Sequence, residues 1–105
     1  VVVAAADLAH MGPVFGDPTP LGEEQKKSIG EADAQLLKLM CLSDSDEFYA
    51  AIKNERDSRR ICGLAPIYLT LRLVGEANGD VCGYDLCPAD PMNTSVVSIC
   101  GVVLE

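Results

Sequence analysis

Hydrophobic residues recur along this chain with two different periods, and the longer period predicts a helix. Between Gly22 and Met40, apolar side chains return every three or four residues, while most charged side chains lie outside that face. Glu23 and Glu24 stand in the first turn, where negative charge complements the helix dipole. The spacing predicts one long helix over residues 22–41 that packs its apolar face against the core.

Three further segments carry a shorter, strand-like pattern. Residues 67–74 place an isoleucine and three leucines on one face, which makes this segment the clearest strand. Residues 48–52 alternate in the same way, and residues 94–104 are β-branched and apolar on both faces. Residues 75–80, which contain an Asn-Gly pair, and residues 87–93 are predicted as loops. One helix packed across at least three antiparallel strands is an α+β fold.

The N-terminal segment, residues 1–11, fits three descriptions: a signal-peptide remnant, a tag, or a Val-rich first strand. Residues 12–22 contain three prolines and three glycines, which predicts an extended arm. The domain proper is expected over residues 12–105, a length that provides one core but not two. No apolar run approaches the roughly 18 residues of a membrane span.

The composition narrows the range of partners. Sixteen acidic residues against eight basic ones give a net charge of −8. This charge repels phosphate groups, so neither nucleic acid nor an anionic membrane is expected as a partner. The chain has no Trp and only three Tyr and two Phe residues, which predicts an aliphatic core and no surface for stacking bases or sugars.

The five cysteines predict disulfides in a secreted, extracellular protein, with one thiol left free or paired outside this sequence. None belongs to a CxxC pair, and the only histidine, His10, is far from them in sequence, so no metal or other cofactor is expected. A single histidine also gives no Ser/His/Asp or Cys/His arrangement, so the chain is not expected to be an enzyme. Asn93 begins an Asn-Thr-Ser acceptor for N-glycosylation.

From Gly12 to Leu104, the order of these features resembles a cystatin, in particular the secreted two-disulfide type found in animals, ticks included. The stretch "GPVFG" corresponds to the family's N-terminal arm, "RRICG" (59–63) to its first hairpin turn, and "IYLTLRLVG" to the strand that follows. The family's later cysteines correspond to Cys82, Cys87 and Cys100. The turn departs from the family's Gln-x-Val-x-Gly, because Arg59 replaces the Gln and Ile61 the Val, and the Pro-Trp hairpin is missing.

The resemblance implies one long helix packed across a curved antiparallel sheet. It also implies a secreted inhibitor that occludes the active-site cleft of papain-like cysteine proteases of the cathepsin class. The residues implied to contact the protease are Gly12, Pro13, Val14, Gly16, Arg59, Ile61, Cys62, Gly63 and Leu64. The departures in the turn favour an alternative, a non-inhibitory protein on the cystatin scaffold that binds another protein target.

Two further features follow from the resemblance. Cystatins that inhibit legumain use a loop after the helix, and the corresponding residues are Ser45, Asp46 and Glu47. The family's disulfide in this region implies a bond between Cys82 and Cys87. For the turn itself, a purely structural role with Cys62 bonded to Cys41 is the other interpretation.

Overall fold

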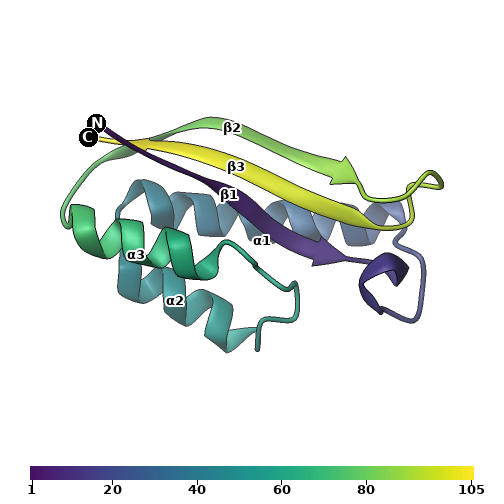
Figure 1. The fold of residues 1–105 in the computed structure, drawn as a ribbon. Coiled ribbons are helices and arrows are strands. Elements are labelled where there is room, and N and C mark those ends of the chain that lie inside the picture. Colours follow the sequence, from purple (N-terminus) through teal and green to yellow (C-terminus); the bar gives the residue numbers. More distant parts are fainter.

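The computed structural model describes all 105 residues and has an α+β fold, as predicted. Its elements in chain order are β1 (Val2–Met11), the short 3-10 helix η1 (Pro13–Phe15), α1 (Glu23–Cys41), α2 (Ser45–Asn54), α3 (Leu64–Val74), β2 (Gly79–Pro88) and β3 (Val96–Leu104). The strands form one antiparallel sheet in the order β1-β3-β2. The helices lie on one side of this sheet, and both chain ends lie at the same end of it (Figure 1).

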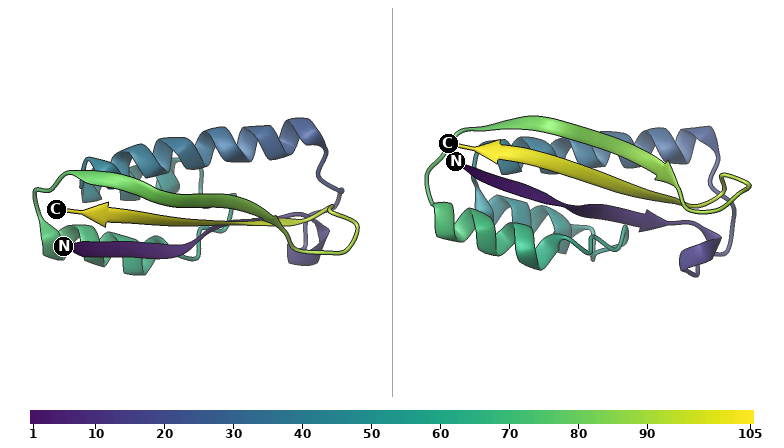
Figure 2. Two further views of the ribbon diagram at one scale, coloured as in Figure 1. Left: turned by 90° about the horizontal axis from the view of Figure 1, so that it is seen from above. Right: turned by 45° about the horizontal axis from the view of Figure 1, so that its top comes forward.

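The sheet therefore has one covered face and one open face (Figure 2). On the central strand β3, Val96, Val102 and Leu104 are buried toward the helices, whereas Ile99 on the other face is 41% exposed. Sixteen buried apolar residues form the core, and Phe48 is the only aromatic residue among them. No helix of this fold has the length and hydrophobicity that crossing a bilayer requires.

The predictions for the first helix and the last strand are confirmed. α1 runs from Glu23 to Cys41 and buries the apolar face that the spacing indicated. β3 falls within the predicted strand over residues 94–104 and pairs with both neighbouring strands. The expectation of one helix is wrong, because two more helices follow α1: α3 packs against β1, and α2 packs against α1 and α3 (Figure 1).

The predicted strand over residues 67–74 is wrong, because these residues belong to α3. The helix buries Ile67 and Leu71, one turn apart, and exposes the leucines between them and after them. A segment so rich in leucine fits both periods, and its flanking residues decide between them. Pro66 lies in the first helical turn, where its missing N–H is tolerated, and Gly75 ends the helix with a φ of +71°.

The predicted strand over residues 48–52 is also wrong, because these residues belong to α2. The side chain of Asp44 caps the helix and accepts a hydrogen bond from the backbone N–H of Glu47, 3.1 Å away. Phe48 and Ile52, one turn apart, are buried in the core. The expected legumain loop is instead the first turn of this helix, formed by Ser45, Asp46 and Glu47.

The expected disulfides are absent, because all five cysteines are free thiols. Cys82 and Cys87, the expected pair, both lie in the edge strand β2. A strand rises about 3.3 Å per residue, so residues five apart are separated by roughly 16 Å, far beyond the roughly 7 Å that a disulfide spans between Cα atoms. The interpretation that Cys62 is bonded to Cys41 is likewise wrong.

Candidate functional site

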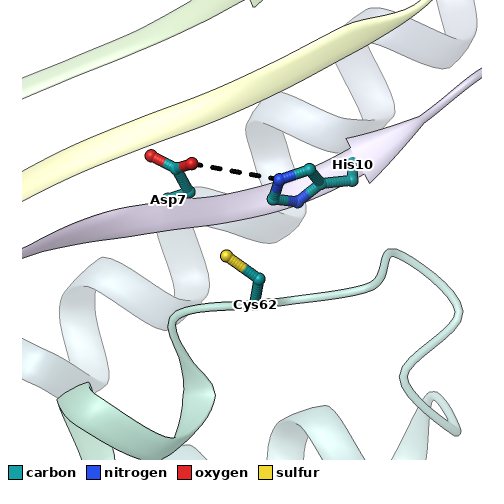
Figure 3. Close-up of side chains that lie close together, drawn as sticks. All are labelled: Asp7, His10 and Cys62. Carbon is teal, nitrogen blue, oxygen red and sulfur yellow. Dashed lines mark ion pairs between the residues drawn. The ribbon is translucent and has the colours of Figure 1, made fainter. Parts of the chain in front are cut away.

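Three side chains that can bind a metal ion meet at the edge of the sheet. Asp7 and His10 come from β1, and Cys62 comes from the segment that joins α2 to α3 (Figure 3). One donor atom from each residue lies within 4.8 Å of the other two. Asp7 and Cys62 are exposed and His10 is half-buried, so the cluster is open to ligands from solution.

A bulge in β1 places the first two of these residues on the same side. Asp7 pairs with Ile99 and His10 with Val97, so two residues of β1 stand opposite Ser98 alone. The backbone N–H of Ala9, inside the bulge, donates to the Ser98 hydroxyl at 2.8 Å. In a regular strand, residues three apart point to opposite faces, and the extra residue in the bulge restores a common side.

The third residue is held by backbone hydrogen bonds along the free edge of β1. The N–H of His10 donates to the carbonyl of Arg59 at 2.8 Å, and the N–H of Gly63 donates to the carbonyl of Asp7 at 3.0 Å. Between them, the N–H of Cys62 points to the carbonyl of Leu8 at 3.4 Å. Residues 59–63 therefore run beside β1 and carry the Cys62 thiol to the cluster.

Backbone carbonyls fix the orientation of the His10 ring. Its Nδ1 lies 3.0 Å from the carbonyl oxygen of Leu8 and 3.1 Å from that of Arg60. Because a carbonyl only accepts, these contacts hold the proton of a neutral imidazole on Nδ1 and leave the lone pair on Nε2. Nε2 faces a carboxylate oxygen of Asp7 at 3.9 Å (Figure 3). Metal-binding histidines in proteins are commonly held through the second ring nitrogen in this way.

The chemistry of the three donors suits a transition metal. Thiolate, imidazole and carboxylate are together the ligands of zinc and of first-row transition metals, whereas Mg²⁺ and Ca²⁺ prefer oxygen alone. Bonds of about 2.0–2.3 Å would bring the donor atoms to roughly 3.3–3.8 Å from one another. The observed limit of 4.8 Å requires only a small contraction to reach that range.

A nucleophilic triad would use the same residue types, and the geometry disfavours it. In such a triad the carboxylate orients one ring nitrogen and the nucleophile lies at the other. Here carbonyls occupy Nδ1, and Asp7 approaches Nε2, the nitrogen that a nucleophile would need. Burial and the negative charge of Asp7 also raise the pKa of the Cys62 thiol, which is the reverse of activation.

A second polar cluster lies in the interior, beneath the sheet. The Arg59 guanidinium pairs with the carboxylates of Asp33 and Glu55, and the Tyr84 hydroxyl donates to the other oxygen of Asp33 at 2.6 Å. Asp33 is fully buried and Arg59 is 6% exposed. Burial and the hydrogen bond to Asp33 raise the pKa of the Tyr84 phenol well above its usual value. No buried side-chain nitrogen or oxygen lacks a partner, so this cluster has the features of a structural network.

The structure does not assemble the residues expected to contact a protease into a wedge. Arg59 and Ile61 are buried, and Gly63 is the N-cap of α3, packed against β1. The stretch 59–63 joins two helices and forms no hairpin turn. Leu64 is the first residue of α3, and Cys62 belongs to the cluster described above. The other expected residues lie in or next to η1: Gly12, Pro13, Val14 and Gly16.

From the sequence, Cys62 is expected in a protease-binding turn, and His10 is not expected to bind a metal because it lies far from the cysteines along the chain. The structure brings them together across the edge of β1. Asp7 was not singled out. The signal that could have found it is Asp-x-x-His at the end of a Val-rich strand, because a bulge brings residues at that spacing to one side.

Comparison with known proteins replaces the resemblance to cystatins. The sequence matches the model of a family described as Memo-like protein over residues 1–103. Neither the search of curated proteins nor the search of solved structures found a match. The family match covers nearly the whole chain and overturns the expected cystatin membership, together with the protease inhibitor and the cystatin-scaffold binder inferred from it.

Proposed function

The chain belongs to the Memo-like protein family, and we propose, from the geometry of its side chains, that it binds a transition-metal ion through Asp7, His10 and Cys62. The observation that carries this proposal is the convergence of three different donor types on one point, with the His10 ring already held through Nδ1. The expectation of no metal rested on distance along the sequence, and the proposal replaces it.

Three protein donors leave at least one position of a four-coordinate ion open. Structural zinc sites are closed by four protein ligands, whereas catalytic sites keep a position for water or substrate. An ion bound here would supply Lewis-acid chemistry, or electron transfer if the metal is redox-active, to a ligand that reaches it from solution. The side chains of Asp7, His10 and Cys62 would hold the ion. Because Asp7 and Cys62 are exposed, a molecule from solution could reach its open position.

Titration with Co²⁺ tests the proposal directly. The metal-free protein is expected to bind one equivalent and to develop the near-ultraviolet band of a cobalt–thiolate bond. Cys62→Ala should abolish that band, and Asp7→Ala and His10→Ala should weaken binding by at least tenfold, in line with the loss of one ligand. Zn²⁺ should compete for the same site.

The exposed thiol of Cys82 provides the matched control. Cys82→Ala removes a cysteine that lies outside the cluster, so the cobalt–thiolate band and the stoichiometry should be unchanged. A band that survives in Cys62→Ala, or that disappears in Cys82→Ala, would assign binding to other cysteines and overturn the proposed site.

Several earlier expectations stay predictions: an extracellular location, glycosylation at Asn93, a protein partner, no nucleic-acid or membrane partner, and no enzyme activity. Asn93 is exposed in the loop between β2 and β3, where a glycan has room. The expected disulfides were one reason to predict secretion, and the five free thiols remove that reason. Mass spectrometry of the protein isolated from its source would test location and glycosylation together.

A further inference from the structure

The segment that carries Cys62 has an unusual backbone. Arg56, Asp57 and Arg60 all adopt positive φ angles, between 51° and 56°, which non-glycine residues rarely do. Such conformations persist where surrounding contacts hold them. One of those contacts is the hydrogen bond from the backbone N–H of Ile61 to the Asp57 carboxylate at 2.8 Å. Another is the hydrogen bond from the backbone N–H of Arg60 to the carbonyl of Asp57 at 3.0 Å.

Arg60 contacts His10 at two separate places. Its backbone carbonyl lies 3.1 Å from Nδ1 of the His10 ring, and its guanidinium donates to the backbone carbonyl of His10 at 3.1 Å. The positive φ at Arg60 turns the chain so that the carbonyl and the side chain of one residue both reach β1. Arg60 also stands two residues before Cys62, so it is linked to two of the three metal ligands.

Asp17 holds the Arg60 guanidinium in place. Two hydrogen bonds join them, at 2.7 Å and 3.2 Å, in the forked arrangement that arginine makes with a carboxylate. The same carboxylate accepts a hydrogen bond from the backbone N–H of Gly12 at 2.7 Å, just after the end of β1. The pair is partly buried, with 23% of the Asp17 side chain and 41% of the Arg60 side chain exposed.

We propose, on the basis of the metal binding argued above, that Arg60 held by Asp17 is the positioning residue of this site. Held by Asp17, Arg60 keeps its own carbonyl against Nδ1 of His10, where it is the second acceptor beside the carbonyl of Leu8. Nε2 is then free for the ion, and the same contacts set the position of Cys62 beside β1. A lysine cannot replace it, because a single ammonium group does not form the fork to Asp17 and the bond to His10 at the same time.

The first test reads the His10 ring in the metal-free protein. His10 is the only histidine, so its two ring nitrogens can be assigned without ambiguity in a long-range ¹H–¹⁵N spectrum. At about pH 8.5, where an ordinary imidazole is neutral, the wild-type ring should show the proton on Nδ1. Arg60→Gln and Arg60→Lys should show a mixture of the two tautomers. An unchanged tautomer in both variants would overturn the positioning role.

The second test measures Co²⁺ affinity and the cobalt–thiolate band in Arg60→Gln and Asp17→Asn. Both variants should bind about tenfold more weakly, as is typical when a contact that orients a metal ligand is lost, and the band should shift. Arg72→Gln is the matched control, because Arg72 is exposed and lies 3.9 Å from Asp46, remote from the cluster. It should bind as the wild type does.

The outcomes separate the two proposals. Wild-type protein that binds no Co²⁺ through Cys62 would overturn the metal site and, with it, this role for Arg60. Wild-type binding with unchanged affinity and band in Arg60→Gln would overturn the positioning role alone. If Arg60→Gln does not fold, Asp17→Asn and Arg60→Lys provide the same comparison with smaller changes.

Discussion

Arg59 and Arg60 are neighbours in the sequence and belong to two opposite kinds of polar cluster. Arg59 points into the interior, where it pairs with the fully buried Asp33. The partly exposed Glu55 and Tyr84 complete this network at its rim. Arg60 points outward, where it contacts Asp17 and His10 beside an open group of metal-binding side chains. One short segment between α2 and α3 therefore contributes a residue to each cluster. The polar atoms of the inner cluster have hydrogen-bond partners, whereas the donor atoms of the outer cluster do not.

The difference indicates where function resides. In the interior network each charge has a partner, so nothing is left to bind a ligand. At the surface the carboxylate of Asp7, Nε2 of His10 and the thiol of Cys62 converge, and Asp7 and His10 remain 3.9 Å apart without a hydrogen bond. Donor atoms that meet without satisfying one another have capacity for an ion. The comparison predicts that loss of the first cluster costs stability and loss of the second costs binding.

The largest expected effect is on stability, in Asp33→Ala. This change leaves the Arg59 guanidinium buried with only Glu55 beside it, and breaking a buried pair costs about 3–5 kcal/mol of unfolding free energy. A domain of ordinary stability has only about 5–15 kcal/mol in total. Asp7→Ala removes an exposed carboxylate and should change the unfolding free energy by no more than about 0.5 kcal/mol. Urea unfolding measures both.

The same two variants should show the reverse order in Co²⁺ binding. Asp7→Ala lacks a ligand, whereas the folded fraction of Asp33→Ala retains all three. If Asp33→Ala proves as stable as Asp7→Ala, the interior network does not hold the fold together, and the distinction between the two clusters fails.

The next largest effect is expected in Gly63→Ala, which should lower both the unfolding free energy and the affinity for Co²⁺. A Cβ atom at this position would lie 2.8 Å from Cβ of Ala6 and closer still to the backbone carbonyl of Asp7. Either β1 or the start of α3 must then shift, at a cost of about 1–3 kcal/mol. Because β1 carries Asp7 and His10, and Cys62 directly precedes Gly63, either shift displaces a metal ligand, so Co²⁺ affinity should fall as well. Urea unfolding and Co²⁺ titration of the same preparation measure the two losses.

Gly83→Ala is the matched control for Gly63→Ala. Gly83 lies in the exposed strand β2, and an added Cβ there meets no atom within 4 Å. Both stability and Co²⁺ affinity should stay close to the wild-type values. A Gly63→Ala variant that behaves like Gly83→Ala would show that the close approach of α3 to β1 does not define the metal site.

Local patterns in the sequence predicted those parts of the fold that depend on local information. The apolar face of α1 and the β-branched run of β3 each have a single reading, and the structure confirms both. α3 could not be read in this way, because leucines fill both faces and satisfy two periods. For α2 a local signal did exist, in the capping residue Asp44 three positions before Glu47, and the apolar alternation that follows it obscured that signal.

The metal cluster could not be predicted from spacing, because its geometry depends on tertiary structure. A bulge opposite Ser98 brings Asp7 and His10 to one side of β1. Cys62 reaches them only after the chain has passed through α1 and α2 and returned to the edge of β1. Cysteines, by contrast, suggested disulfides on count alone. They lie at the end of α1, between α2 and α3, and in the sheet, and none is paired, so the number of thiols did not indicate pairing.

The smallest expected effect is on the way that thermal stability falls as the pH is lowered, and it tests the Asp17–Arg60 pair without any metal. The hydrogen bond from Arg60, aided by that from the Gly12 N–H, lowers the pKa of Asp17 in the folded protein. The unfolded chain binds that proton more readily, with a pKa of about 3.9. The stabilisation is therefore complete above that pH and is lost as the pH falls through the lower, folded value. In Asp17→Asn the titrating group is absent, so thermal unfolding should show a lower midpoint than the wild type at neutral pH, and the gap should close on acidification.

Asp90, which also has a lowered pKa through its contacts with Thr94, keeps its contribution in both proteins and cancels in the comparison. A gap that stays constant from neutral pH to strong acid would mean that the charge of Asp17 does not hold Arg60, and the support that the outer cluster receives from this pair would have to come from packing alone.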